Sequence, residues 1–136
     1  MLKKKFFATA LVAVALTVGG GATMANAAGG SMPSGCSLSP VAPSNNGSYI
    51  KYSGTGSCTN ARVERFVVRL VHNYNNLPDV RVTWTDDYTS PWSGGQSTVC
   101  DGGGTTEYYT QAVFYQAASY GGDVWSDSAN KTLTHC

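Results

Sequence analysis

The chain has 136 residues, of which 42% are hydrophobic and 12% are charged, and its 9 Lys and Arg against 8 Asp and Glu give a formal net charge of +1. This balance argues against the basic patch that nucleic-acid binding requires and against a polybasic membrane-surface segment. The length predicts a single domain.

Residues 1–27 have the composition of a secretory signal peptide. Residues 3–5 are lysines, an apolar run covers 6–18, and residues 25–27 read Ala-Asn-Ala, an A-x-A cleavage motif. The apolar run is too short to span a bilayer, so we expect no membrane anchor. We expect cleavage after Ala27 and release as a secreted, extracellular protein. Cleavage removes three of the nine basic residues, and the remaining six against eight acidic residues give the mature chain a net charge of −2.

Residues 28–35 are small and are expected to form a flexible leader without core residues, ahead of a single β-sandwich domain over 36–136. Pro40 and Pro43 indicate that the first strand, near 37–41, lies at a sheet edge, because proline cannot donate to a ladder. The pair Asn46-Gly47 is typical of tight hairpins and predicts a turn over 44–47 before a strand at 48–52.

Two further runs have strand patterns. In the run 60–74, Phe66, Val68 and Leu70 share one face, and valines and arginines occupy the other. In the run 80–85, apolar residues alternate with Arg and Thr, which is typical of a half-buried strand. By this alternation we expect Trp84 to face the core.

The longest strand-like run, 105–118, and the return segment 123–133 predict a central hairpin. Both faces of the first segment carry aromatic and β-branched side chains, which suits a strand inside a sheet whose outer face is partly covered. A glycine turn, Gly121-Gly122, separates the two segments. Clusters of Tyr, Thr, Val and Phe disfavour a helix over the same residues.

Residues 107–133, EYYTQAVFYQAASYGGDVWSDSANKTL, resemble the last hairpin of fibronectin-type-III and other immunoglobulin-like domains. In those domains a Tyr-led alternating strand is followed by a Gly-containing turn and a Thr/Leu strand. The resemblance implies an all-β fold, an antiparallel immunoglobulin-like β-sandwich of about seven strands. The cysteine pattern departs from both families, because neither pairs a cysteine before this hairpin with one after it.

Four cysteines, all in the mature part, predict two disulfides in a small exported chain: Cys36, Cys58, Cys100 and Cys136. Three pairings are open. We favour Cys36–Cys58 and Cys100–Cys136, because each pair then brackets a local hairpin. Zinc binding is disfavoured because no C-x-x-C pair is present, and we expect no metal site.

Residues suited to catalysis are few. His72 and His135 are the only histidines, and the sequence has no Gly-x-Ser-x-Gly elbow. Cysteines held in disulfides supply no thiolate nucleophile. We therefore expect that the protein is not an enzyme and that it needs no cofactor.

The segment from Trp84 to Gly95, WTDDYTSPWSGG, has the strongest binding character. We expect a long exposed loop with Trp92 as the main anchor and with Tyr88, Asp86 and Asp87 assisting, because Trp and Tyr dominate recognition surfaces. Pro91 would stiffen this loop. The alternative is that Trp92 folds back as a core plug.

Three functions remain open. The first is a secreted, non-catalytic, monomeric module that binds an extracellular protein or glycan. The second is an inhibitor of a secreted hydrolase, because the chain is similar to tendamistat-type inhibitors in its cysteine order and aromatic loop, although it lacks their Trp-Arg-Tyr motif. The third is a toxin or antimicrobial, which the mature charge disfavours. A glycan binder should expose aromatics on one sheet face, and an inhibitor should expose one stiff loop.

Overall fold

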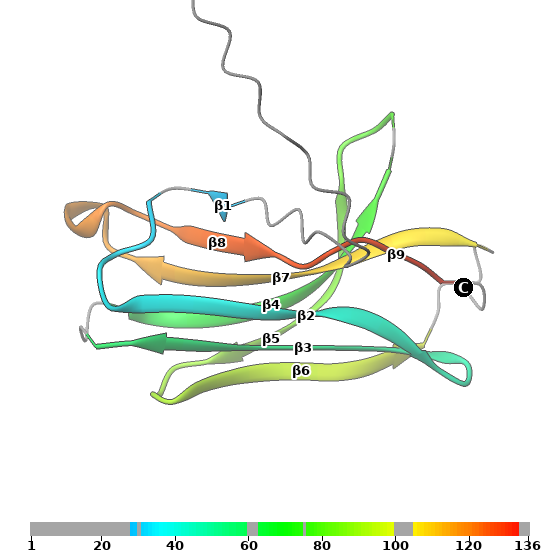
Figure 1. The fold of residues 1–136 in the computed structure, drawn as a ribbon, viewed down its shortest axis with the longest axis horizontal. Coiled ribbons are helices and arrows are strands. Elements are labelled where there is room, and N and C mark those ends of the chain that lie inside the picture. The colour runs from blue at the N-terminus through cyan, green and yellow to red at the C-terminus, as the bar shows by residue number, and fades with distance from the viewer. Residues whose placement is uncertain (1–27, 30, 60–62, 75, 100–104, 134–136) are drawn as a thin grey trace, which may run out of the picture.

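The computed structural model describes residues 28–133 apart from residues 30, 60–62, 75 and 100–104. The described chain is all-β, with two antiparallel sheets that stack as a sandwich (Figure 1). The strands are β1 (Ala28–Gly29), β2 (Cys36–Asn46), β3 (Tyr49–Cys58), β4 (Val63–Asn73), β5 (Val80–Asp87), β6 (Trp92–Val99), β7 (Thr106–Gln116), β8 (Val124–Asp127) and β9 (Lys131–Leu133).

One sheet has six strands in the order β1-β8-β7-β4-β5, with β9 also pairing with β7, and the other has three in the order β2-β3-β6. The chain crosses between the sheets after β1, β3, β5 and β6. The described residues thus form nine strands rather than about seven, and the two shortest, β1 and β9, account for the difference. No helix in this part of the chain is long and apolar enough to cross a membrane.

The first hairpin confirms the expected edge strand and places the turn over residues 46–49, two residues later than the expected turn over 44–47. β2 pairs only with β3, so Pro40 and Pro43 lie on an edge, and the pairing shifts register between Val41 and Ser44. Asn46 pairs with Tyr49, which leaves residues 47–48 as a two-residue loop. Gly47 has a φ of 64°, which glycine adopts without the steric cost other residues carry.

The predicted central hairpin is confirmed as β7 and β8. The alternate residues Tyr108, Thr110, Ala112, Phe114 and Gln116 of β7 are all buried. Intermediate exposure is found at Tyr109, Gln111 and Tyr115 on the other face, as expected for a partly covered outer face. β7 lies between β4 and β8, so the sheet extends on both sides of it.

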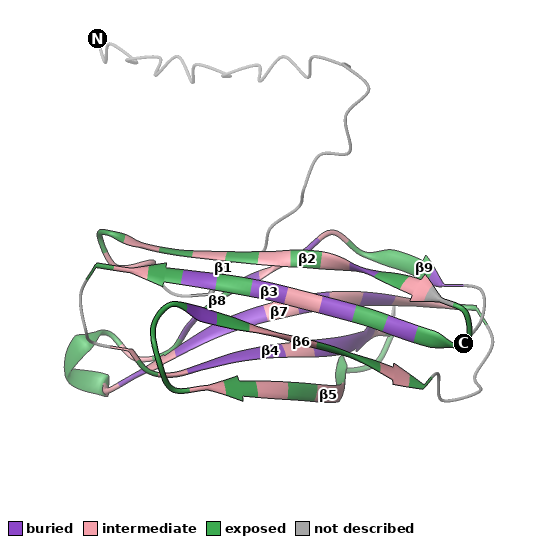
Figure 2. Ribbon diagram, turned by 90° about the horizontal axis from the view of Figure 1, so that it is seen from below, coloured by how far each residue is buried: buried purple, intermediate pink, exposed green. Residues whose placement is uncertain are grey.

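The core lies between the two sheets and is centred on aromatic rings. Phe66 of β4 contacts Phe114 of β7 with 5.5 Å between ring centroids, and Trp92 of β6 meets Phe114 edge-on at 5.3 Å. On the three-stranded sheet, buried and exposed residues alternate along β3 (Figure 2). Gly56 of β3 is buried directly beneath these rings, because a Cβ atom there would lie 2.6 Å from Phe114.

The two sheets are also joined along β5 and β6 by polar side chains. The hydroxyl oxygen of Thr85 accepts a hydrogen bond from the backbone N–H of Gly95 at 2.9 Å. The side-chain amide of Gln96 donates to the hydroxyl of Thr83 at 2.8 Å. These side chains of β5 therefore cover part of the free edge of β6.

The disulfide Cys36–Cys58 is confirmed, and it joins residues that face each other across β2 and β3. The expected Cys100–Cys136 bridge and the signal peptide 1–27 lie outside the described residues. The expectation that 28–35 contributes nothing to the core is wrong at Met32, which packs against the core cluster. Ala28 and Gly29 also pair with Ser126 and Trp125 of β8.

Replacing both Cys36 and Cys58 by alanine should lower the free energy of unfolding by about 3 kcal/mol, the loop-entropy value for a bridge spanning 22 residues. Urea titration of the wild type and the double variant measures this difference. Equal midpoints and slopes would show that the bridge adds no stability.

Candidate functional site

The segment Trp84 to Gly95 is not a long loop, because β5 extends to Asp87 and β6 begins at Trp92, leaving only residues 88–91 between them. Trp92 has 6% of its surface exposed and belongs to the core cluster. The prediction that Trp92 is an exposed binding anchor is therefore wrong, and the alternative that it packs in the core is confirmed. The reason is geometric. Trp92 lies opposite Gly56 of β3, which has no side chain to fill the space between the sheets.

Asp87 holds the turn between β5 and β6. Its carboxylate accepts hydrogen bonds from the backbone N–H groups of Ser93 at 3.1 Å and Thr89 at 3.2 Å, and from the Thr89 hydroxyl. These bonds, the one from Ser93 first, hold the pKa of Asp87 below its usual range. Asp87 therefore stabilises the turn, and its predicted role in binding stays a prediction.

Asp86 and Tyr88, the other two expected site residues, meet at Arg65 of β4. Arg65 lies 3.5 Å from the Asp86 carboxylate, and the Tyr88 hydroxyl is a hydrogen-bond partner of the same guanidinium. Tyr88 is 66% exposed. The Trp84 indole also donates to Asp86 at 3.2 Å. The structure thus brings Asp86 and Tyr88 together at the rim of the six-stranded sheet.

The expectation that Trp84 faces the core is wrong, because its side chain is 49% exposed. The β4–β5 pairing shifts register between Leu70 and Val71, which leaves Val82 as an extra residue on β5. Such a bulge changes which face the following residues occupy. Val82 packs against the core, and Trp84 instead lies opposite Arg69 on the outside.

We call the side of the six-stranded sheet that points away from the core the outer face. The strand registers place its side chains in rows that cross several strands. One row is Asp86, Val67, Val113 and Trp125, and the next is Trp84, Arg69, Gln111 and Asp127.

Arginines order the aromatic residues of this face. Arg65 lies 4.1 Å above the Tyr115 ring, and Arg81 lies 4.7 Å from the centre of the Trp84 ring. Arg69 donates a hydrogen bond to the Tyr115 hydroxyl. Cation–π contacts of this kind are attractive, by about 0.5–1 kcal/mol at exposed sites, and favour these side-chain positions.

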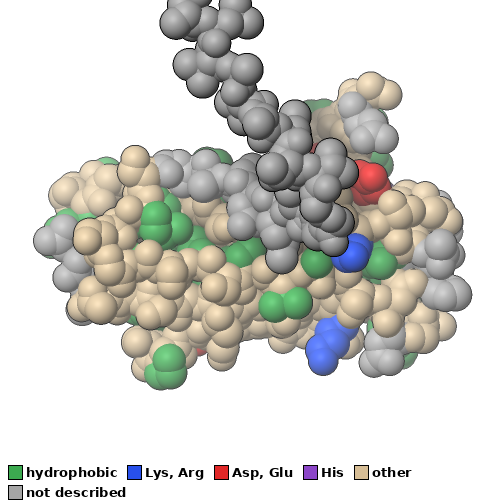
Figure 3. Space-filling model, viewed as in Figure 1, with side chains coloured by type: hydrophobic (Ala, Val, Ile, Leu, Met, Phe, Trp, Pro, Cys, Tyr) green, Lys and Arg blue, Asp and Glu red, His purple; other side chains and the backbone are tan. Residues whose placement is uncertain are grey.

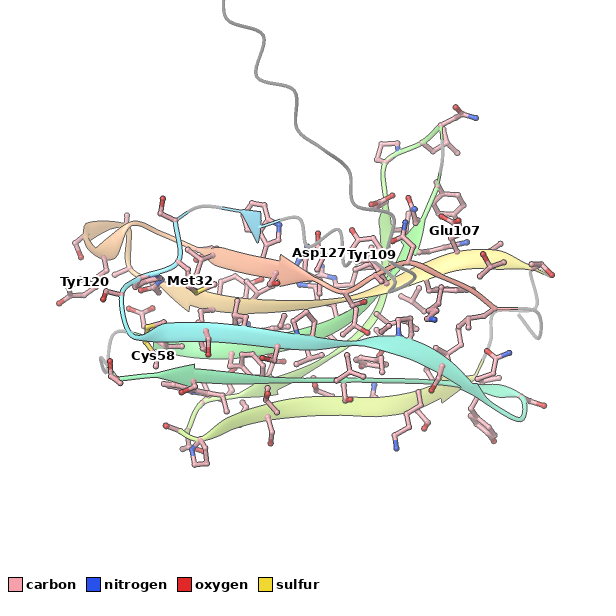
Figure 4. The ribbon with its side chains drawn as sticks, viewed as in Figure 1. Met32, Cys58, Glu107, Tyr109, Tyr120 and Asp127 are labelled. Atoms are coloured by element: carbon pink, nitrogen blue, oxygen red, sulfur yellow. A yellow bond between two sulfur atoms is a disulfide. The ribbon has the colours of Figure 1, made fainter. Side chains whose placement is uncertain are left out.

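A depression of about 390 Å³ lies on the outer face over β7 and β8. Its lining comprises two aromatic residues, one valine and four polar residues: Tyr109, Trp125, Val113, Arg69, Gln111, Asp123 and Asp127. Figure 4 shows Tyr109 and Asp127 close to each other on the side of β7 and β8 that faces away from β3. On the face seen in Figure 3, few Lys, Arg, Asp or Glu side chains are visible among the described residues.

Hydrogen bonds and burial set the electrostatics of the depression. Gln111 donates to Asp127 at 2.8 Å, and the Tyr109 hydroxyl donates to Asp79 at 2.9 Å. Burial raises the pKa of Asp127, and the Asp79 charge raises it further. The pKa of Tyr109 is also raised, first by burial and then by its bond to Asp79. Arg69 has a buried Nε atom without a hydrogen-bond partner.

No cluster of three or more His, Cys, Asp or Glu residues in the described ranges is arranged to hold a metal ion. His72 is buried and stacks on Tyr108 with 4.8 Å between ring centroids. No protein-family model, curated protein or solved structure matches this chain.

Replacing Trp92 by alanine should lower the free energy of unfolding by about 3–5 kcal/mol, because it opens a cavity beside Phe114. The matched control is Trp84→Ala, which removes an exposed indole and should cost less than about 1 kcal/mol. Chemical denaturation measures both. Similar losses for the two variants would contradict the assignment of Trp92 to the core.

Replacing Asp87 by alanine should destabilise the protein at pH 7 by about 1 kcal/mol, the size of a capping interaction. Because the folded-state pKa of Asp87 is lowered, its contribution is present above the usual aspartate pKa and is lost as the pH falls through the folded-state value. Thermal midpoints of wild type and variant should therefore converge in acid. A difference independent of pH would contradict this role for the carboxylate.

Proposed function

We propose that the protein is a secreted, non-catalytic binding module on an immunoglobulin-like sandwich, and that the outer face is its recognition surface. The strand order supports the fold assignment. The three-stranded sheet, β2-β3-β6, corresponds to strands A, B and E of immunoglobulin-like domains. The strands β8-β7-β4-β5 of the other sheet correspond to strands G, F, C and C′. The partner is an extracellular protein or glycan, and binding needs no cofactor.

The observation that carries this proposal is the composition of the outer face. Trp84, Tyr115 and Trp125 share it with Arg65 and Arg69. Tryptophan, tyrosine and arginine are the residue types that contribute most to binding energy when a partner covers them. The contacts of Arg65 and Arg69 with Tyr115 hold these side chains in place before binding, which reduces the entropy lost on association.

The inhibitor alternative has narrower support. The connection 88–91 is short and is tied by Asp87, and Tyr88 is its only large exposed hydrophobic residue. Tyr88 also lies beside Arg65, so it extends the outer face at one rim. A partner that covers the outer face would therefore touch Tyr88 and Asp86 as well.

The test compares immobilised mature protein, residues 28–136, with two variants in the culture medium of the producing organism. Replacing Trp84 and Trp125 by alanine should raise the Kd for the captured partner tenfold or more, as hot-spot truncations do. The control is Tyr49→Ala, which removes an aromatic residue of similar exposure on β3 and should leave capture unchanged.

Surface plasmon resonance with the purified partner gives the Kd values, and thermal midpoints establish that each variant is folded. Capture that is unaffected by the double variant, or that falls equally with Tyr49→Ala, would overturn the assignment of recognition to the outer face.

A further inference from the structure

We propose that the depression over β7 and β8 binds a neutral sugar, whose ring stacks on Trp125 and whose hydroxyl groups bond to Asp127, Gln111 and Arg69. This inference rests on the proposed function and names the chemistry of the partner at one part of the outer face. Size, hydrogen-bonding capacity and charge of the depression each support it.

The size and rigidity of the depression suit a small ligand group. Its volume of about 390 Å³ falls within the range of small-molecule sites. Gln111 and Val113 on β7 and Trp125 and Asp127 on β8 form its centre, and these residues face one another in the paired ladder. Because paired strands fix these positions, the ligand meets a site that is already formed.

The polar row across the depression offers both donors and acceptors. Asp127 is an acceptor with about four lone-pair positions, of which Gln111 occupies one. Arg69 lines the depression, and its guanidinium carries five N–H donors and no acceptor. A hydroxyl group both donates and accepts, so a ring with several hydroxyls can satisfy both residues at once.

The charges disfavour ionic ligands. An anion placed near Arg69 would also lie near Asp123 and Asp127, which line the same depression. A cation placed on Asp127 would lie beside the Arg69 guanidinium, which would repel it. Burial also disfavours the charged form of the Asp127 carboxylate, which weakens its attraction for a cation. A neutral ligand avoids both repulsions.

The aromatic rings supply the apolar part of the site. Trp125 is 37% exposed, and Tyr109 lies on the other side of the row formed by Arg69, Gln111 and Asp127. The C–H face of a pyranose ring is apolar and packs on the face of an aromatic side chain, while the hydroxyls at the ring's rim stay free to bond. Two flanking aromatics with a polar row between them therefore match the two chemical faces of a sugar.

The experiment measures depletion of soluble mature protein by insoluble cellulose, chitin, xylan and starch, with chitosan as the cationic counterpart of chitin. We expect retention on at least one of the four neutral polysaccharides. Trp125→Ala and Gln111→Ala should each weaken that retention tenfold or more, and Trp125→Phe should restore part of it. Tyr49→Ala should bind as the wild type does, and thermal midpoints establish that the variants are folded.

Three results would overturn the inference. They are retention on none of the neutral polysaccharides, retention on chitosan alone, and retention that Trp125→Ala and Gln111→Ala do not weaken. A protein partner that depends on Trp84 and Trp125, found together with no polysaccharide binding, would overturn the sugar site and leave the proposed recognition surface standing. A culture-medium partner independent of both tryptophans would overturn the recognition surface itself.

Discussion

The close packing of Phe114 on Gly56 is the contact on which the rest of the sandwich depends. A Cβ atom at Gly56 would approach two ring carbons of Phe114 at 2.6 and 2.7 Å, far inside normal contact. Only a strand without a side chain at this point lets the two sheets approach closely enough for Trp92 and Phe66 to share the same space. Gly94 of β6 is equally close to the opposite sheet, because a Cβ atom there would lie 2.8 Å from Val68, so glycines in β3 and β6 set the sheet separation.

The same contact determines what β7 shows to the outside. Once Phe114 is turned inward, alternation along the strand turns Tyr109, Gln111 and Val113 outward. β4 is held in register with β7 through Phe66 opposite Phe114, which places Arg69 beside Gln111. The inward residues of β7 therefore determine which of its residues lie on the outer face. A change in the core that shifts β7 would also displace the depression.

Local patterns predicted the β7–β8 hairpin, the edge position of the proline-bearing strand and the Cys36–Cys58 bridge, because each depends on residues close in sequence. Trp92 and Trp84 were assigned to the wrong sides. Their positions depend on a glycine in another strand and on a bulge in the pairing with β4, and neither is visible in a local pattern. Asp86 and Tyr88 were predicted as binding residues, and the structure places both beside Arg65. The outer-face rows combine β4 and β5 with β7 and β8, two pairs of strands that are separated in the chain by β6. The aromatic residues on both faces of 105–118 were the one sequence pattern that indicated a possible binding surface on the outer face.

The closed edges of the three-stranded sheet affect how this protein behaves at high concentration. Along β2, Pro40 lacks an N–H group, and the register shift after Val41 bends the ladder. Along β6, the N–H group of Gly95 is already bonded to Thr85. A strand from another copy would find interrupted hydrogen-bonding partners on either edge. A domain with these edges resists the strand-to-strand stacking that leads to amyloid-like fibres.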